Sequence, residues 1–179
     1  MKLVVITGSH HKEGTTAHLA ESFIKGAVES GNKIFRFDAA FEAIHPCLAC
    51  DECKKGDKIC IQKDALHKLY LPLIEADCVV FVTPIYYFGM SAQLKTVIDR
   101  FYAVNSSLRE KEKRVILITA SGDSEQWVID PIIKQYEALS GYLKWRDSGR
   151  VIAAGFYTRS DIEKSDFPRK AYELGKSLL

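Results

Sequence analysis

Short apolar segments alternate along the chain with longer segments of helical periodicity. The apolar segments are rich in branched residues and predict five strands, at residues 2–7, 33–38, 77–83, 113–120 and 150–157. Apolar residues three and four positions apart predict helices at residues 16–30, 64–76, 92–101, 125–143 and 167–179. Pro72 falls inside the second of these helices and is expected to kink or split it.

This alternation predicts the fold class. A strand that is apolar throughout, such as residues 78–82, is typical of a parallel sheet covered by helices on both faces. Right-handed crossovers leave few topologies for five such units, and the strand order 2-1-3-4-5 is the natural candidate. We therefore expect a single α/β domain over residues 1–179, in which a doubly wound five-stranded parallel sheet lies between two helical layers.

Three loops are expected to meet at the carboxyl edge of this sheet, where open α/β folds bind ligands. The loop at residues 8–16 is rich in Gly, Ser and Thr and leads into a helix, an arrangement that favours an anion. It lacks the Lys-Ser/Thr ending of a triphosphate loop and the three-glycine dinucleotide fingerprint, so we expect a monophosphate. The loop at residues 84–90 carries a proline and three aromatic residues, and the loop at 121–124 is small and polar. A phosphate site beside a flat aromatic shelf predicts flavin mononucleotide (FMN).

The first two loops also have simpler structural interpretations. Thr15 and Thr16 are good helix-capping residues. The aromatic residues of the other loop could merely cover the top of the core. Neither loop taken alone decides between ligand binding and a structural role.

Composition narrows the classes of partner. The chain has 179 residues, 47% of them hydrophobic, and a formal net charge of +2, which gives no bias toward nucleic acid. No apolar stretch is long enough to span a membrane, and the apolar run at residues 1–7 is too brief for a signal peptide. We expect a cytoplasmic protein, in which the five cysteines are thiols, redox centres or metal ligands rather than structural disulfides.

Two segments resemble the signatures of the NAD(P)H-dependent FMN reductase family, which has the flavodoxin-like fold. GSHHKEGTT, at residues 8–16, is similar to that family's phosphate loop, and PIYYFGMSAQLKTVIDR, at residues 84–100, is similar to its second signature. The resemblance implies FMN as cofactor and NAD(P)H as co-substrate. His11 stands where the family often has arginine, and Thr15 where it has asparagine. Because histidine is only partly charged near neutral pH, we expect weaker and pH-sensitive phosphate binding.

The resemblance also assigns roles to individual residues. It implies that the FMN phosphate is held by Ser9, His11, Thr15 and Thr16. It implies that the ribityl chain and the ring contact Pro84, Ile85, Tyr86 and Tyr87, with Ser121 and Gly122 also at the ring. No side chain is expected to act as a catalytic acid or base. Lys95 and Asp99 are expected to be no more than an exposed ion pair on one helix face.

Four cysteines form a compact group in an insertion at about residues 45–62. Cys47, Cys50, Cys53 and Cys60 have the spacing C-x2-C-x2-C-x6-C, which suits an iron–sulfur cluster better than the two separated pairs of most zinc sites. The spacing resembles the cysteine motif of the iron–sulfur flavoproteins, a subgroup of the same fold, which implies a [4Fe-4S] cluster. Free thiols, a redox-active pair and a zinc site remain open alternatives. Cys78 begins a buried strand and is expected to serve packing alone.

These features predict an FMN-dependent oxidoreductase. It would take hydride from NAD(P)H and pass electrons to a flavin, a quinone, a redox protein or the iron–sulfur cluster, and we expect it to be at least a homodimer. One alternative is an electron-transfer protein without its own NAD(P)H oxidation, either an iron–sulfur flavoprotein or a flavodoxin-like carrier. The weak net charge argues against the flavodoxin-like carrier, because such carriers are strongly acidic. A second alternative is a redox sensor that signals through the cysteines.

Overall fold

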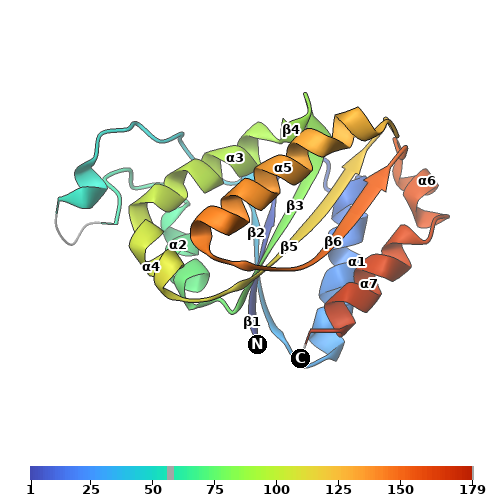
Figure 1. The fold of residues 1–179 in the computed structure, drawn as a ribbon, viewed down its shortest axis with the longest axis horizontal. Helices are drawn as coiled ribbons and strands as arrows, with labels where there is room; N and C mark the ends of the chain where they lie inside the picture. Colours follow the sequence, from blue (N-terminus) through green and yellow to red (C-terminus); the bar gives the residue numbers. More distant parts are fainter. Residues whose placement is uncertain (56–58, 179) are drawn as a thin grey trace.

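A parallel sheet forms the centre of the molecule (Figure 1). The computed structural model describes residues 1–55 and 59–178. Its five long strands are β1 (Lys2–Thr7), β2 (Lys33–Asp38), β3 (Cys78–Tyr86), β5 (Arg114–Ser121) and β6 (Arg146–Ala154). They pair in parallel in the order β2-β1-β3-β5-β6. This is the predicted 2-1-3-4-5 arrangement of the five parallel strands, so the predicted fold class is confirmed.

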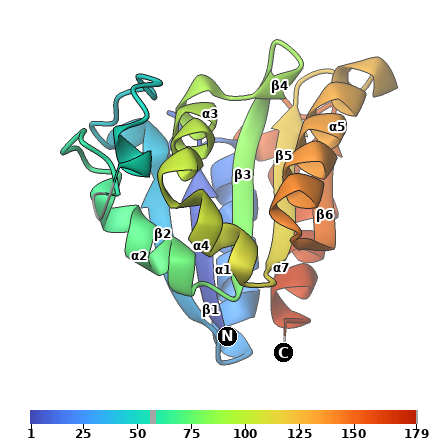
Figure 2. The same ribbon diagram turned by 60° about the vertical axis from the view of Figure 1, so that its left-hand side comes forward.

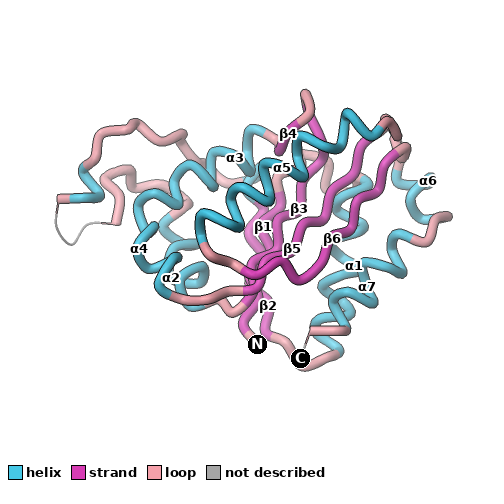
Figure 3. Tube along the Cα trace, viewed as in Figure 1, coloured by secondary structure: helices cyan, strands magenta, loops and turns pink. Residues whose placement is uncertain are grey.

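Helices cover both faces of the sheet (Figures 2 and 3). One face packs against α1 (Thr15–Glu29), α6 (Arg159–Glu163) and α7 (Phe167–Lys176). The other packs against α2 (His67–Glu75), α3 (Ala92–Asp99), α4 (Asn105–Glu110) and α5 (Gln126–Leu143). Successive strand residues point to opposite faces, so that Val4 belongs to one hydrophobic cluster while Leu3 and Val5 belong to the other. The result is the expected three-layer arrangement.

Several boundaries differ from the predictions. Helix α2 begins at His67 and continues through Pro72 without a break, so the proline does not split it. Strand β6 begins at Arg146 and ends at Ala154, earlier at both ends than the apolar run suggested. The sequence also gave no sign of α4, α6 or the two-residue strand β4 (Gly89–Met90), which pairs antiparallel with the end of β3. Three short 3₁₀ helices were also not predicted, except that the helix expected at residues 92–101 covered the first two residues of the last: η1 (Ala39–Phe41), η2 (Glu52–Lys54) and η3 (Arg100–Val104).

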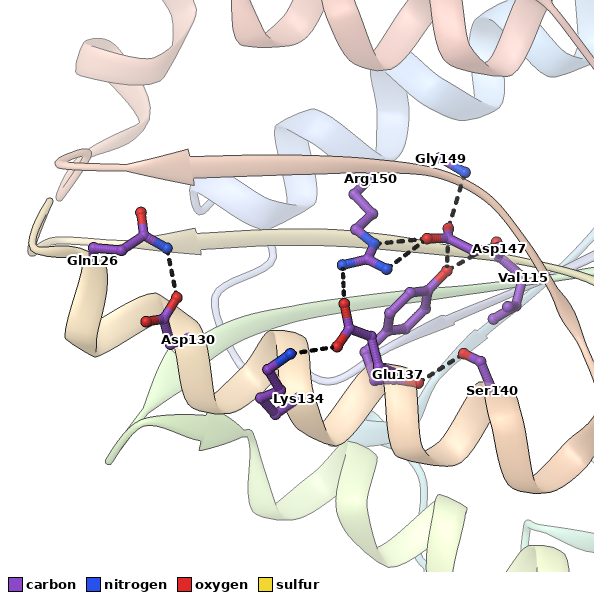
Figure 4. A network of polar contacts seen from close by, with 10 residues as sticks. Val115, Gln126, Asp130, Lys134, Glu137, Ser140, Asp147, Gly149 and Arg150 are labelled. Atoms are coloured by element: carbon purple, nitrogen blue, oxygen red, sulfur yellow. Dashed lines mark hydrogen bonds and ion pairs between the residues drawn. The ribbon is translucent and has the colours of Figure 1, made fainter.

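A polar network explains the early start of β6 (Figure 4). The Tyr136 hydroxyl lies 3.0 Å from the carbonyl of Val115 and 2.7 Å from the carboxylate of Asp147. Arg150 pairs with Asp147 at 2.7 Å and with Glu137 of α5 at 3.0 Å. The register between β5 and β6 shifts between Val115 and Leu117, beside this network. Polar contacts, rather than apolar side chains, therefore support the first residues of β6.

Within the described residues, every helix is too short or too polar to cross a membrane.

Candidate functional site

A cleft of about 780 Å³ opens at the carboxyl ends of the strands. This size lies within the range of pockets for small molecules and cofactors, about 300–1,000 Å³. Nine of the ten residues predicted to bind FMN line it: Ser9, His11, Thr15, Thr16, Pro84, Ile85, Tyr86, Ser121 and Gly122. The loops after β1, β3 and β5 therefore meet as the topology predicted, and the segment after β6 joins them.

The loop after β1 presents free polar groups to the cleft. Helix α1 has Gly14 as its N-cap residue and no side-chain cap, so Thr15 and Thr16 do not serve the capping role that was an alternative for them. The amides of the first helical turn have no partners within a helix and carry partial positive charge. The Ser9 hydroxyl accepts a hydrogen bond from the His11 amide at 3.1 Å, which folds the loop around the helix start. This arrangement suits an anion.

Two histidines and two basic side chains line the cleft around the start of α1. His10, His11 and Lys12 line the cleft together with Arg159, and Glu13 is the acidic residue among them. A hydrogen bond from Arg159 to Glu163 raises the pKa of the guanidinium, so Arg159 is charged at all ordinary pH values. Arg159 was not predicted at the site, because it follows β6 in a segment with no recognisable motif.

The aromatic loop after β3 forms a wall of the cleft and a hairpin beyond it. Pro84 is buried, Ile85 is half-buried and Tyr86 is 49% exposed, and all three line the cleft. Tyr87 and Phe88 form the two-residue turn between β3 and β4, with φ angles of 45° and 66°. This turn carries Tyr87 out into solvent, where it is 98% exposed. Tyr87 was expected at the ring, but it lies outside the cleft.

Two aromatic residues after β6, Phe156 and Tyr157, also line the cleft. A Cβ atom on Gly122 would lie 2.8 Å from the ring of Tyr157, so this glycine is needed for their close approach. The amide of Phe156 donates to the carbonyl of Ser121 at 2.9 Å, which ties the segment after β6 to the loop after β5. Tyr157 is 87% exposed at the rim of the cleft. Its ring and the Pro84–Tyr86 wall offer apolar surface to a flat ligand.

Ser91 links the loop after β1 to the end of β3 and to the start of α3. Its hydroxyl donates to the carbonyl of Gly8 at 2.8 Å and accepts from the Leu94 amide at 3.4 Å, so it also caps α3. Its own amide donates to the hydroxyl of Thr83 at 3.0 Å. A Cβ atom on Gly8 would lie only 2.3 Å from the Ser91 hydroxyl oxygen. Ser91, for which no role was predicted, therefore connects the loop after β1 to β3.

A second group of chemically active side chains lies at the far end of α3. We call residues 45–55 and 59–62 the cysteine loop; in Figure 1 this segment stands out from the helical layer beside α2 and α3. Cys47, Cys50, Cys53 and Cys60 line one small cavity. All are free thiols, and burial together with the nearby thiols raises the pKa of Cys53.

The four cysteines form a suitable set of thiolate donors around one cavity, but they are not assembled into a coordination site. Among the described residues, no three His, Cys, Asp or Glu side chains are grouped so that they could hold a metal ion. The backbone nevertheless adopts unusual conformations between the cysteines. Ala49 and Asp51 have φ angles of 51° and 56°, which non-glycine residues rarely adopt. The Ala49 amide also donates to the sulfur of Cys47 at 3.4 Å. Cys78 lies apart in the core, where burial raises the pKa of its thiol to about 12.

Comparison with known proteins identifies the family. Residues 1–139 match the NADPH-dependent FMN reductases. The chain belongs to this family. The predicted family and the flavodoxin-like fold are thus confirmed.

Two relatives of this FMN reductase family member and one solved structure are informative. An iron-sulfur flavoprotein of Methanocaldococcus jannaschii is 37% identical over 106 residues, 58% of this chain and 52% of the relative. An iron-sulfur flavoprotein of Archaeoglobus fulgidus is 32% identical over 168 residues, 90% of this chain and 85% of the relative. The crystal structure of an azoreductase from Bacillus anthracis superposes with a TM-score of 0.78 at 16% identity, covering 99% of this chain and 100% of that one, and so shares the fold. The chain spans only 52% and 66% of the lengths of two iron-sulfur flavoproteins of Methanocaldococcus jannaschii, and 55% of the length of another from Archaeoglobus fulgidus.

Proposed function

We propose that this FMN reductase family member binds FMN in the cleft, takes hydride from NAD(P)H and passes electrons on through a [4Fe-4S] cluster in the cysteine loop. The final acceptor would be a small molecule, such as a flavin or a quinone, or a redox protein. The observation that carries the proposal is the convergence, in one cleft of suitable size, of an uncapped helix start, cationic side chains and an apolar wall.

Different residues of the cleft would bind different parts of FMN. The first-turn amides of α1, with Ser9, Thr15 and Thr16, would bind the phosphate. The wall formed by Pro84, Ile85 and Tyr86 would position the ring, with Ser121 and Gly122 at its other side. When bound, FMN supplies the capacity to accept hydride and to release electrons one at a time. The protein would supply binding and orientation, and no side chain of the cleft is assigned as an acid or base.

The cysteine loop fits an iron–sulfur cluster in the kind and number of its ligands. Four thiols line one cavity, and a backbone amide already donates to the sulfur of Cys47. The named iron-sulfur flavoprotein relatives support the same assignment. Cys47, Cys50, Cys53 and Cys60 would therefore be the ligands, with thiolate sulfur as the donor.

The proposal extends to assembly and location. We propose a homodimer, because Tyr157 at the rim of the cleft and Tyr87 in the neighbouring β3–β4 turn are both exposed to solvent. All five cysteines are free thiols, which fits a reducing compartment such as the cytoplasm.

The first test is a visible spectrum of protein purified without oxygen, with iron and sulfide analysis, followed by addition of NADPH or NADH. We expect flavin bands, a broad iron–sulfur absorption and bleaching of the flavin by one of the nicotinamides. Flavin that only a separate reductase can bleach would favour the electron carrier. Slow turnover with a conformational change on thiol oxidation would favour the redox sensor. If no flavin binds even after FMN is added, the central claim is wrong.

A second test isolates the phosphate cradle. Riboflavin lacks the phosphate of FMN, so the ratio of the two dissociation constants reports that group alone. The double variant Thr15→Val, Thr16→Val keeps the side-chain shapes and removes two hydroxyls, which should weaken FMN binding about tenfold or more if each hydroxyl contributes about 1 kcal/mol. Riboflavin binding should be unchanged. An equal loss for both ligands would place the phosphate elsewhere.

A further inference from the structure

A buried ion pair lies where the two ends of the cysteine loop come together. The side chains of Arg100 and Asp64 pair directly and are 1% and 5% exposed. Asp64 precedes α2, and Arg100 follows α3 directly. Removing two charges from water is costly unless further hydrogen bonds support them. The partners of these two side chains therefore indicate what the pair is for.

Most of those partners belong to the cysteine loop. Arg100 donates from Nη1 to the carbonyl of His45 at 3.1 Å and from Nη2 to the carbonyl of Gln62 at 3.4 Å. Asp64 accepts from the His45 amide at 3.0 Å and from the Leu66 amide at 3.1 Å. Although burial alone would raise it, these hydrogen bonds and the one from Arg100 hold the pKa of Asp64 below its ordinary value. His45 and Gln62 are the first and last residues of the loop, so the ion pair closes it.

The guanidinium also reaches one of the thiols. Arg100 Nη2 lies 3.4 Å from the sulfur of Cys60, and Arg100 lines the same cavity as all four cysteines. Its Nε atom is buried and finds no hydrogen-bond partner among the described residues. A permanently charged side chain is thus held against a candidate ligand. The potential of an iron–sulfur cluster depends on nearby charge and on hydrogen bonds to its sulfurs.

We propose that Arg100 is a positioning residue for the iron–sulfur cluster. Its forked hydrogen bonds close the loop and place Cys60, and its positive charge offsets the negative charge of four thiolate ligands. The charge favours the reduced cluster, which carries one more electron, and so keeps the reduction potential higher than it would be without Arg100. This inference rests on the cluster of the proposed function.

The experiment compares wild type with Arg100→Lys and with the double variant Asp64→Leu, Arg100→Met, after anaerobic reconstitution with iron and sulfide. Replacing both partners by apolar residues avoids an unpaired buried charge and so protects folding. Lys95→Met serves as control, because Lys95 lies on α3 and makes an exposed ion pair with Asp99 at 2.5 Å. The readouts are iron per chain, the midpoint potential from a redox titration, and proteolysis and alkylation rates of the cysteine loop in the iron-free protein.

Each variant has a distinct expected result. Lysine keeps the charge but not the fork, so Arg100→Lys should open the loop to protease and alkylation while the potential of any bound cluster stays near that of wild type. The double variant should open the loop, lose most of its iron and show a more negative potential. Lys95→Met should match wild type in all readouts.

The outcomes separate the inference from the proposed function. If wild type binds iron and the double variant matches it in iron content, potential and loop protection, the inference is wrong. If wild type binds no iron, the proposed cluster and the electrostatic part of the inference both fail. In that case the iron-free protein still decides the closing role: equal cleavage and alkylation rates in wild type and double variant would refute it.

Discussion

Ser91 does not line the cleft, but its hydroxyl is bonded to the loop after β1, which does. Replacing Ser91 should therefore destabilise that loop. Substitution by alanine removes the hydroxyl that caps α3 and donates to the carbonyl of Gly8. Ser91 is fully buried and Gly8 is buried, so water does not readily replace the lost bond. Loss of a helix cap costs about 1 kcal/mol, and a buried carbonyl left without a partner costs about 1–3 kcal/mol. We therefore expect Ser91→Ala to lower the free energy of unfolding by about 2–4 kcal/mol.

The assay is equilibrium urea unfolding of the FMN-free protein, in which the midpoint should fall while the slope stays constant. In thermal unfolding, the same loss corresponds to a fall in Tm of about 5–12 °C for a chain of this length. FMN affinity should fall as well, because the phosphate loop loses its anchor. Ser22→Ala is the matched control: the Ser22 hydroxyl donates to the His18 carbonyl at 2.9 Å within α1, and its loss should change stability by less than about 0.5 kcal/mol.

A loss below about 1 kcal/mol for Ser91→Ala, or one equal to that of Ser22→Ala, would refute the reasoning. It would mean that the loop after β1 keeps its position without the bond from Ser91.

Two further predictions concern packing and pH. Gly175→Ala should destabilise the protein by about 1–3 kcal/mol, because the new Cβ would lie 2.1 Å from the carbonyl oxygen of Phe23 and force α7 away from α1. Gly141→Ala in α5 is its control and should stabilise by up to about 1 kcal/mol, since nothing lies within 4 Å of the added methyl group; equal Tm shifts for the two variants would refute the packing argument. Burial lowers the pKa of Lys113 to about 8 from 10.5, so the folded chain binds fewer protons than the unfolded chain between these values. The free energy of unfolding should therefore rise with pH across this window, by up to about 3 kcal/mol relative to Lys113→Met. Urea unfolding of both proteins at pH 8 and 10 measures this difference. If the free energies of unfolding of the two proteins change equally between these pH values, the pKa of Lys113 is not lowered.

The parallel sheet could be predicted because its strands are buried on both faces and so consist of continuous apolar runs. Because connections between parallel strands are right-handed, only a few strand orders were then possible. Strand β4 could not be predicted, since two residues carry no periodicity and its turn uses Tyr87 and Phe88 where glycine or asparagine is usual. The start of β6 was missed for a different reason: its first residues are held by the polar contacts of Tyr136 and Arg150 rather than by apolar burial.

The candidate site also contains some residues that could be predicted from the sequence and others that could not. Residues in contiguous motifs, such as Ser9 and Thr16, could be placed at the cleft from sequence and topology. Arg159 could not, because it reaches the cleft from a segment without a motif. The spacing of the cysteines predicted a group of ligands, but the pairing of Asp64 with Arg100 at the base of the loop joins residues 36 positions apart and leaves no local pattern.

Helix α3 sets the distance between the two candidate redox sites. Ser91 at its amino end is bonded to the loop after β1, and Arg100 at its carboxyl end is bonded to both ends of the cysteine loop. The nine residue steps between them span roughly 14 Å along the axis, and each step turns the chain by about 100°. A one-residue insertion in α3 would leave the helix intact, yet it would swing Arg100 away from Asp64 or Ser91 away from Gly8. The length of this single helix is therefore under a constraint that its composition does not reveal.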